Sequence, residues 1–251
     1  MDLMSTADWT LVEWVFVISS IAILPVIIFA MVASFRVQST FNKYRKMGVR
    51  SNLTAGQFAE QLLREHNIDC RVEQGHGHLS DHYDPRSKTV VLSPAVYSGR
   101  DVAAYGVAAH EVGHAIQDAT GYAPLKMRQV IIKSTSLINR MLMPIIIIGV
   151  FAQFFIFFDS PIFIYFIIAL VIFYGISFLV SLVTLPVEYN ASTRARQMIR
   201  DSNTMDSDEQ QGASRVLSAA ALTYFAGMAV SLVFFLRHLS FLLILLARSR
   251  R

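Results

Sequence analysis

The sequence predicts a mostly α-helical membrane protein, with about four membrane helices and one small aqueous α+β domain. Of its 251 residues, 54% are hydrophobic and only 16% are charged, whereas an average soluble domain is about 25% charged. The hydrophobic residues also gather in long stretches that contain no charge. This composition excludes a disordered chain, a collagen and an ordinary soluble enzyme.

Four uncharged stretches predict the membrane helices. Crossing a bilayer takes about 20 apolar residues, and at this length only a helix satisfies its own backbone in lipid. The fourth stretch ends at Arg237, and a charge at mid-membrane costs about 2.5–3.5 kcal/mol. This stretch therefore either crosses the bilayer, begins in water or lies along the membrane. The stretches are 14–35, 141–158, 161–186 and 216–236.

The residues that flank these stretches predict how the chain is oriented. Acidic residues and no Lys or Arg precede the first stretch, which favours an uncleaved anchor over a signal peptide. Lys and Arg follow the first stretch, precede the second and follow the third, and the link between the second and third has neither. Basic flanks stay in the cytoplasm, so segments 36–140 and 187–215 are expected there, in a multi-pass protein of the cell membrane.

Five segments follow from this topology. We expect, in order, a membrane anchor, a cytoplasmic domain, a two-helix membrane hairpin, a helix with a cytoplasmic loop, and a C-terminal membrane-associated helix. The net charge is only +4, and the membrane-flanking basic residues account for it, so the charge does not indicate a nucleic-acid partner. The segments are 1–36, 37–140, 141–186, 187–215 and 216–251.

The cytoplasmic domain has its own pattern of helices and strands. Apolar residues at helical spacing, a β-branched run and turn residues mark its elements. Asp101 is suited to cap the last helix, and Gly121 stands near its end. The elements are a helix over 52–66, β-structure over 68–93 with a turn at 84–87 and a strand at 88–93, and a helix from 102 to about 119.

The last of these helices carries an H-E-x-x-H motif. His110 and His114 are four residues apart, so both rings project from one helix face and can bind a single ion. Zinc accepts neutral imidazole nitrogens, and Glu111 is placed to take a proton from a metal-activated water without being a ligand itself. The alternative is a helix with two surface histidines and a solvated glutamate.

A catalytic zinc needs a third protein ligand. No third His follows at the spacing of metzincins, and the chain lacks the Asp-Gly pair of site-2-type intramembrane proteases. The remaining solution is Glu188, at the expected cytoplasmic end of the third stretch, where Pro186 fits a kink or a restart of the helix. The alternative is that Glu188 caps a helix or pairs with Arg194.

Three motifs together resemble a known family. The segments GVAAHEVGHA, LSDHYDPRSKTVVLS and LPVEYNASTRA, followed by ALTYFA, are similar to the YugP-type neutral zinc metallopeptidases. These are bacterial membrane proteins, more distantly related to HtpX-like membrane peptidases. The resemblance implies a gluzincin-like core, one zinc ion, His110, His114 and Glu188 as its ligands, and Glu111 as the catalytic base.

The chain departs from the wider gluzincin pattern at one position. Four residues after the ligand Glu, where an Asp often orients a ligand His, this sequence has Ser192. Orientation of the imidazoles is a requirement of such sites. We therefore expect Asn190 or Ser192 to take this role.

Several further residues are weaker candidates. His82 and Tyr83 lie just before the strand at 88–93, which is expected at the sheet edge and either binds an extended peptide or is an ordinary hairpin strand. Tyr224 either donates to the oxyanion or is an interfacial aromatic. Three loop histidines form either a second metal site or a solvated cluster. They are His76, His78 and His82.

These observations predict a membrane-anchored zinc endopeptidase that acts on a protein or peptide near the lipid bilayer. It would hydrolyse peptide bonds with a metal-activated water. Two alternatives remain at this point: a membrane protein that holds zinc for structure alone, and an intramembrane protease with zinc inside the bilayer. The polar residues Asp101 and Asp118 at the ends of the motif helix count against the second alternative.

Overall fold

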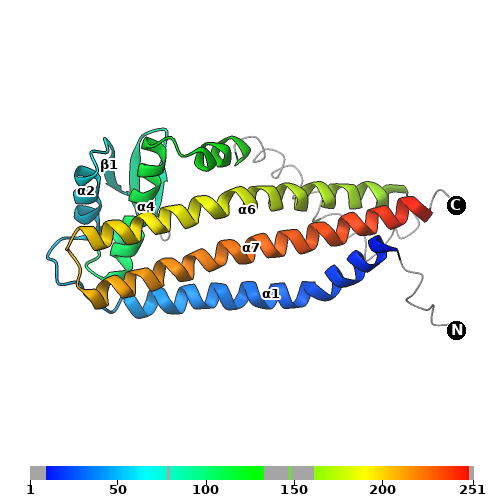
Figure 1. Ribbon diagram of the computed structural model, residues 1–251, viewed down its shortest axis with the longest axis horizontal. Coiled ribbons are helices and arrows are strands. Elements are labelled where there is room, and N and C mark those ends of the chain that lie inside the picture. The colour runs from blue at the N-terminus through cyan, green and yellow to red at the C-terminus, as the bar shows by residue number, and fades with distance from the viewer. Residues whose placement is uncertain (1–9, 78–79, 133–146, 148–160, 249–251) are drawn as a thin grey trace. The chain divides into compact units, whose positions relative to one another are not determined.

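The computed structural model describes residues 10–77, 80–132, 147 and 161–248 (Figure 1). The chain divides into two compact units. The first contains Met1–Met31, Gln129–Leu182 and Ala226–Arg251, and the second contains Val32–Arg128 and Val183–Phe225. The motif helix and Glu188 both belong to the second unit.

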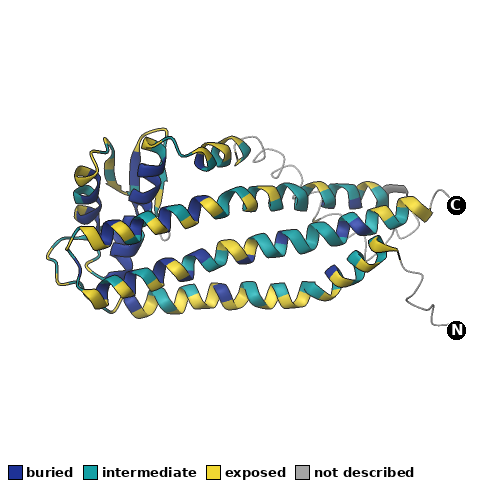
Figure 2. Cartoon of the chain, viewed as in Figure 1, coloured by how far each residue is buried: buried dark blue, intermediate teal, exposed yellow. Residues whose placement is uncertain are grey.

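Three helices of the described residues are long and apolar enough to cross a membrane. They are α1 (Leu11–Tyr44), α6 (Pro161–Asp201) and α7 (Ser207–Arg248). Only 6% of the residues in the most apolar part of α1 are buried by protein, and much of this helix is exposed in Figure 2. Such exposed apolar surface suits contact with lipid. The predicted helix at 141–158 lies outside the described residues, except for residue 147.

Two of these helices extend beyond the apolar stretches that predicted them. Pro186 lies inside α6, so the helix does not restart there, and one continuous helix contains both the third apolar stretch and Glu188. The fourth stretch likewise forms part of one long helix, α7, which continues through Arg237. A proline is tolerated within a long helix at the cost of one backbone hydrogen bond.

The second unit contains a small mixed sheet. Strand β3 (Thr89–Leu92) is its central strand, paired in parallel with β1 (Arg71–Gln74) and antiparallel with β2 (His82–Asp84). The expectation that 88–93 is an edge strand is therefore wrong, because neighbours occupy both of its edges. Its apolar run fits this central place, since three of its four residues are buried. A peptide cannot pair with β3, and the free edge of this hairpin belongs to β2.

The two helices that the sequence predicts in this unit pack against the sheet. Helix α2 (Ala55–Glu65) begins with a capping box formed by Thr54 and Gln57. Helix α4 (Val102–Ala119) begins at Asp101, whose side chain accepts a hydrogen bond from the backbone of residue 104 over 3.0 Å. Their buried faces appear dark blue in Figure 2, and the short helix α3 (Pro94–Tyr97) links β3 to α4.

The core of this unit fixes the position of α4. The rings of Phe58 on α2 and Tyr105 on α4 stack with centroids 4.4 Å apart, and both side chains are fully buried. Burial of such side chains contributes roughly 1.5–3 kcal/mol each. Gly121 then ends α4 in a left-handed conformation with φ +67°, and the chain becomes helical again over 123–132.

Candidate metal centre

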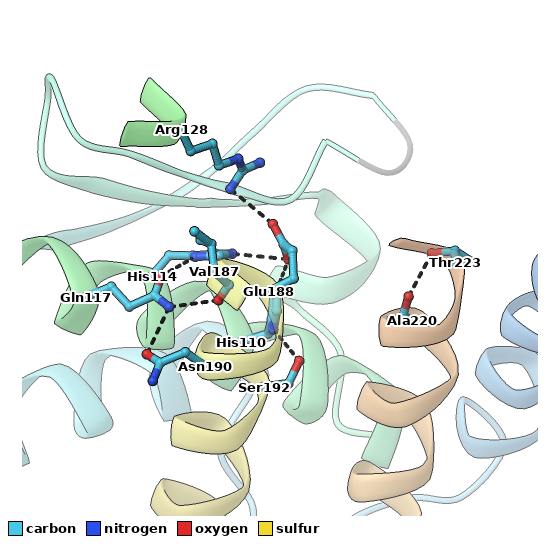
Figure 3. A network of polar contacts seen from close by, with 10 residues as sticks. All are labelled: His110, His114, Gln117, Arg128, Val187, Glu188, Asn190, Ser192, Ala220 and Thr223. Carbon is cyan, nitrogen blue, oxygen red and sulfur yellow. Dashed lines mark hydrogen bonds and ion pairs between the residues drawn. The ribbon is translucent and has the colours of Figure 1, made fainter. Parts of the chain in front are cut away.

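Three side chains from two helices converge in the second unit (Figure 3). Nε2 of His110 lies 3.1 Å from Oε2 of Glu188, and Nε2 of His114 lies 3.6 Å from the same oxygen. One ligand atom from each residue lies within 4.8 Å of the other two. The structure thus brings together the three residues that the sequence nominates as metal ligands.

A glycine allows α4 and α6 to approach this closely. Gly113 lies between the two histidines, and a Cβ built on it would be 2.7 Å from the carbonyl oxygen of Ala191. That distance is shorter than real Cβ contacts, and the neighbour is backbone, which cannot rotate away. A side chain at Gly113 would therefore push α6, and with it Glu188, away from the histidines.

A chain of hydrogen bonds fixes which nitrogen of His114 carries the proton. Arg194 donates to Oδ1 of Asn190 over 2.8 Å. The amide nitrogen of Gln117 donates to the same oxygen and to the carbonyl of Val187. Oε1 of Gln117 therefore faces Nδ1 of His114, at 2.9 Å. Since this oxygen only accepts, Nδ1 is the donor, and the Nε2 lone pair is left for a metal.

His110 has a different partner. The hydroxyl of Ser192 lies 3.3 Å from its Nδ1, and Ser192 is buried. Ser192 thus occupies the place expected for a residue that orients a ligand imidazole. Among the described residues, Asn190 forms no hydrogen bond with a histidine and instead accepts one from Gln117.

Glu188 is held at both carboxylate oxygens. Its side chain is only 2% exposed. Oε1 pairs with the guanidinium of Arg128 over 3.0 Å, while Oε2 faces the two histidines. A buried carboxylate needs such partners. The pairing with Arg128 leaves one oxygen of Glu188 available to a metal ion.

Glu111 lies next to the group without belonging to it. Its side chain is buried, yet among the described residues it forms no hydrogen bond or ion pair with another side chain. Tyr224 of α7 lies near enough to Glu188 and Glu111 for the charges of both carboxylates to act on it. The carboxylate of Glu111 and the phenol of Tyr224 therefore lie near the three converging side chains.

The negative charges around His114 change its protonation. Burial alone would lower the pKa of His114, but the hydrogen bond to Glu188 and the charges of Glu111 and Glu188 outweigh burial. The pKa of His114 is therefore above the ordinary histidine value. A metal ion that binds His114 therefore has to displace a proton from the ring.

The donor set fits zinc. Two imidazoles and one carboxylate form the ligand set of many catalytic zinc sites, which keep a fourth position open. With bonds of about 2.0–2.1 Å, neighbouring ligands of a tetrahedral zinc ion are about 3.3–3.4 Å apart. The distances of 3.1 and 3.6 Å from Oε2 of Glu188 to the two imidazoles bracket this separation.

Comparison with known proteins agrees with this chemistry. A family model described as "Putative neutral zinc metallopeptidase" matches residues 19–243. The chain belongs to this family. It is also 38% identical over 207 residues to the "Putative membrane protease YugP" of Bacillus subtilis (strain 168). The aligned residues make up 82% of this chain and 88% of the relative. No solved structure matches the chain.

The segment that matches the neutral zinc metallopeptidase family contains all three converging residues and Glu111. Family membership confirms the resemblance that the motifs indicate, and it associates the chain with zinc and with peptidases. The similarity to a membrane protease agrees with the three apolar helices. The roles of the individual residues rest on the geometry described above.

The other nominated residues lie outside the group. His82 is exposed, and its Nδ1 contacts the carbonyl of Ser80 over 2.7 Å. The hydroxyl of Tyr83 donates to Asp118 over 2.8 Å, which ties β2 to the end of α4. Within the described ranges, neither His76 nor His82 joins a group of three or more ligating side chains, and His78 lies outside the described residues.

Two residues at this centre are absent from the sequence prediction. Gln117 stands three residues after His114, a spacing that places two side chains on the same helix face. The sequence alone could therefore have predicted its contact with His114. Arg128 could not be predicted in this way, because its contact with Glu188 depends on how the chain turns after Gly121. No short-range spacing relates Arg128 to the motif.

Proposed function

We propose that the protein is a membrane-anchored zinc endopeptidase whose zinc ion is bound by His110, His114 and Glu188. The observation that carries the proposal is the convergence of these three side chains beside the carboxylate of Glu111, which has no ion-pair partner among the described residues. A site that bound zinc only for structure would be closed by four ligands. The described residues offer three, together with a carboxylate suited to proton transfer.

Zinc bound at this centre would polarise the substrate carbonyl and lower the pKa of water. Glu111 would take the proton from the attacking water and pass it to the leaving amine. Glu111 is buried, and none of the described residues forms an ion pair with it, so its carboxylate is available for these transfers. The Tyr224 hydroxyl would donate to the oxygen that becomes negative during attack.

Strand β2 would hold the substrate. It is an edge strand of the sheet, and its outer edge can pair with an extended peptide through main-chain hydrogen bonds. The bond from Tyr83 to Asp118 ties this strand to the end of the motif helix. A peptide on β2 would therefore run alongside the residues proposed for catalysis.

The substrates would be membrane proteins or proteins close to the membrane. Glu188 follows the third apolar stretch by only two residues within the same helix. Because one helix carries both features, the proposed centre would lie near the surface of the bilayer. Helix α4 is not among the three candidate spans of the described residues, which does not favour an intramembrane protease with its motif helix in the bilayer.

The decisive test compares the zinc-loaded wild type with Glu111→Gln. We expect the wild type to cleave an unfolded protein, and the variant to keep one zinc ion per chain while losing at least a hundredfold in rate. Glu65→Gln, on the exposed surface of α2, is the matched control and should cleave normally. Equal cleavage by both glutamate variants, or a closed four-ligand zinc site in a spectroscopic measurement, would refute the mechanism.

We also propose that the second unit faces the cytoplasm, as the basic flanks predict. Glu73 is exposed on β1, so a Glu73→Cys substitution in a Cys70→Ser background provides one accessible thiol. A membrane-impermeant maleimide should label this thiol only after the cells are permeabilised. Labelling in intact cells would place the unit outside.

A further inference from the structure

A half-open cavity lined by several basic side chains lies in the second unit, between the end of α1 and the first half of α7. Its volume is about 420 Å³. Arg36, Thr40 and Lys43 line it from α1, and Arg215 and Ser218 line it from α7. None of these residues belongs to the proposed metal centre.

The cavity carries a concentrated positive charge. Three cations, Arg36, Lys43 and Arg215, line it, and no carboxylate does. Arg196 adds a fourth, because its guanidinium donates to the hydroxyl of Ser218 over 3.2 Å. In the described part of the chain, none of these four cations forms an ion pair with Asp or Glu. Unpaired cations gathered around one space favour an anionic ligand.

Part of this site is held in place before any ligand arrives. Arg215 donates to the hydroxyl of Tyr44 over 3.2 Å and to the side-chain oxygen of Gln211 over 3.0 Å. Tyr44 is itself buried. Such fixed donors lose little conformational entropy on binding. The hydroxyls of Thr40 and Ser218 add short-range donors to the long-range charge.

The position of the cavity in the sequence indicates the kind of anion. Arg36 is the first residue after the apolar stretch of α1, so the cavity begins where that helix would leave the hydrocarbon. Directly before it, Val32 and Phe35 are exposed, at 55% and 76%. A ligand with a phosphate at Arg36 and acyl chains along these side chains would match both surfaces.

We propose that this cavity binds the headgroup of an anionic phospholipid. The phosphate accepts hydrogen bonds from Arg36, Lys43 and Arg215, and the acyl chains lie against the exposed apolar face of α1. A free phosphate would satisfy the cations but would leave the adjoining apolar surface unused. The continuity of charged and apolar surface therefore favours the lipid.

The bound headgroup would also stabilise the N-terminal end of the motif helix α4. A Cβ built on Gly212 of α7 would lie 2.7 Å from the ring of Tyr44 and 2.9 Å from Val102. Tyr44 lines the cavity, and Val102 is the first residue of α4. The lipid site and the start of the motif helix are thus joined through one closely packed contact.

The test counts bound lipid on the purified full chain in a neutral detergent. Native mass spectrometry would follow titration with dioleoylphosphatidylglycerol, with dioleoylphosphatidylcholine and with inorganic phosphate. The variant Arg36→Gln/Lys43→Gln removes two cations of the cavity. Lys46→Gln/Arg50→Gln removes two cations of the same basic segment that do not line it, so both variants have the same net charge.

We expect one phosphatidylglycerol to bind the wild type and the control variant. Each cation near a phosphate strengthens binding several-fold, so the cavity variant, which lacks two of them, should bind roughly tenfold to thirtyfold more weakly. Equal loss in both variants would mean that only the overall charge of the flank matters and would overturn the proposal. Equal binding of phosphatidylcholine, or displacement of the lipid by millimolar phosphate, would also overturn it.

Discussion

The side-chain oxygen of Gln117 lies 2.9 Å from Nδ1 of His114 and accepts a hydrogen bond from it. Because the amide nitrogen of Gln117 already donates to two other acceptors, the side-chain amide cannot flip. Replacing it with leucine removes the acceptor while keeping a similar volume. We expect Gln117→Leu to lower zinc affinity about tenfold to a hundredfold, measured by competition with a chromophoric chelator.

The control for this substitution is Gln197→Leu, at an exposed position of α6. It should leave zinc affinity unchanged. If Gln117→Leu binds zinc as tightly as the wild type, then the amide does not position His114.

Two glycines of α4 provide a matched pair of substitutions. A Cβ on Gly106 would lie 3.6 Å from the backbone of Ala213, an ordinary contact, whereas a Cβ on Gly113 would lie 2.7 Å from the carbonyl oxygen of Ala191. Alanine in a helix normally stabilises by about 0.5–1 kcal/mol relative to glycine. We expect Gly106→Ala to raise the free energy of unfolding, and Gly113→Ala to lower it by about 1–3 kcal/mol.

Chemical unfolding of both variants measures this difference, and zinc affinity provides a second readout. Gly113→Ala should also bind zinc more weakly, because it pushes α6 and Glu188 away from the histidines. Equal stability and equal zinc affinity in the two variants would contradict the close approach of the helices.

Local patterns predict much of this molecule. The cap at Asp101, the helix that follows it and the spacing of His110 and His114 are short-range features, and the structure has them as expected. The place of β3 within the sheet is different in kind. Its apolar run fits a central strand and a half-buried edge strand equally well, and only the long-range parallel pairing with β1 decides between them.

The residues of the metal centre likewise differ in whether the sequence alone predicts them. Glu188 could be predicted from the sequence because the basic flanks put it on the same side of the membrane as the motif helix, unlike Glu13 and Asp159, which also stand at the ends of apolar stretches. Arg128 could not be predicted, since the contact that makes it part of the centre arises only after the chain reverses beyond α4. Side chains that complete a centre from elsewhere in the chain leave no periodic signal.

Zinc binding should depend on pH through His114. Its pKa is above the ordinary value in the metal-free protein, and zinc binds only the neutral imidazole. A raised pKa means that the ring becomes protonated at a higher pH than usual. As the pH is lowered, zinc affinity should therefore begin to fall while the pH is still above 6.5, the ordinary histidine value. Below that point we expect about a tenfold loss per pH unit for each proton displaced.

Zinc affinity measured between pH 5.5 and 8 tests this expectation. His82→Gln is the control, because His82 is exposed and lies outside the three-residue group, and its curve should match that of the wild type. An affinity that stayed constant down to pH 6 would show that no proton competes for His114.

The hydrogen bond from Tyr83 to Asp118 should fix the position of β2. Burial and the Asp118 carboxylate both raise the pKa of the Tyr83 hydroxyl, so it remains a donor at any pH at which the protein is handled. A bond to a charged group contributes about 1.5–3 kcal/mol. We therefore expect Tyr83→Phe to lower the free energy of unfolding by about that amount and to raise KM for a peptide substrate while zinc content stays the same.

Tyr97→Phe is the matched control, since the Tyr97 ring packs near Gly56 and the described residues give its hydroxyl no hydrogen-bond partner. It should change neither the unfolding free energy nor KM. If Tyr83→Phe lowered stability but left KM unchanged, β2 would still be tied to α4, but it would not be the strand that holds the substrate. The proposed path of the peptide along β2 would then be wrong, whereas the assignment of Glu111 as the proton carrier would be unaffected.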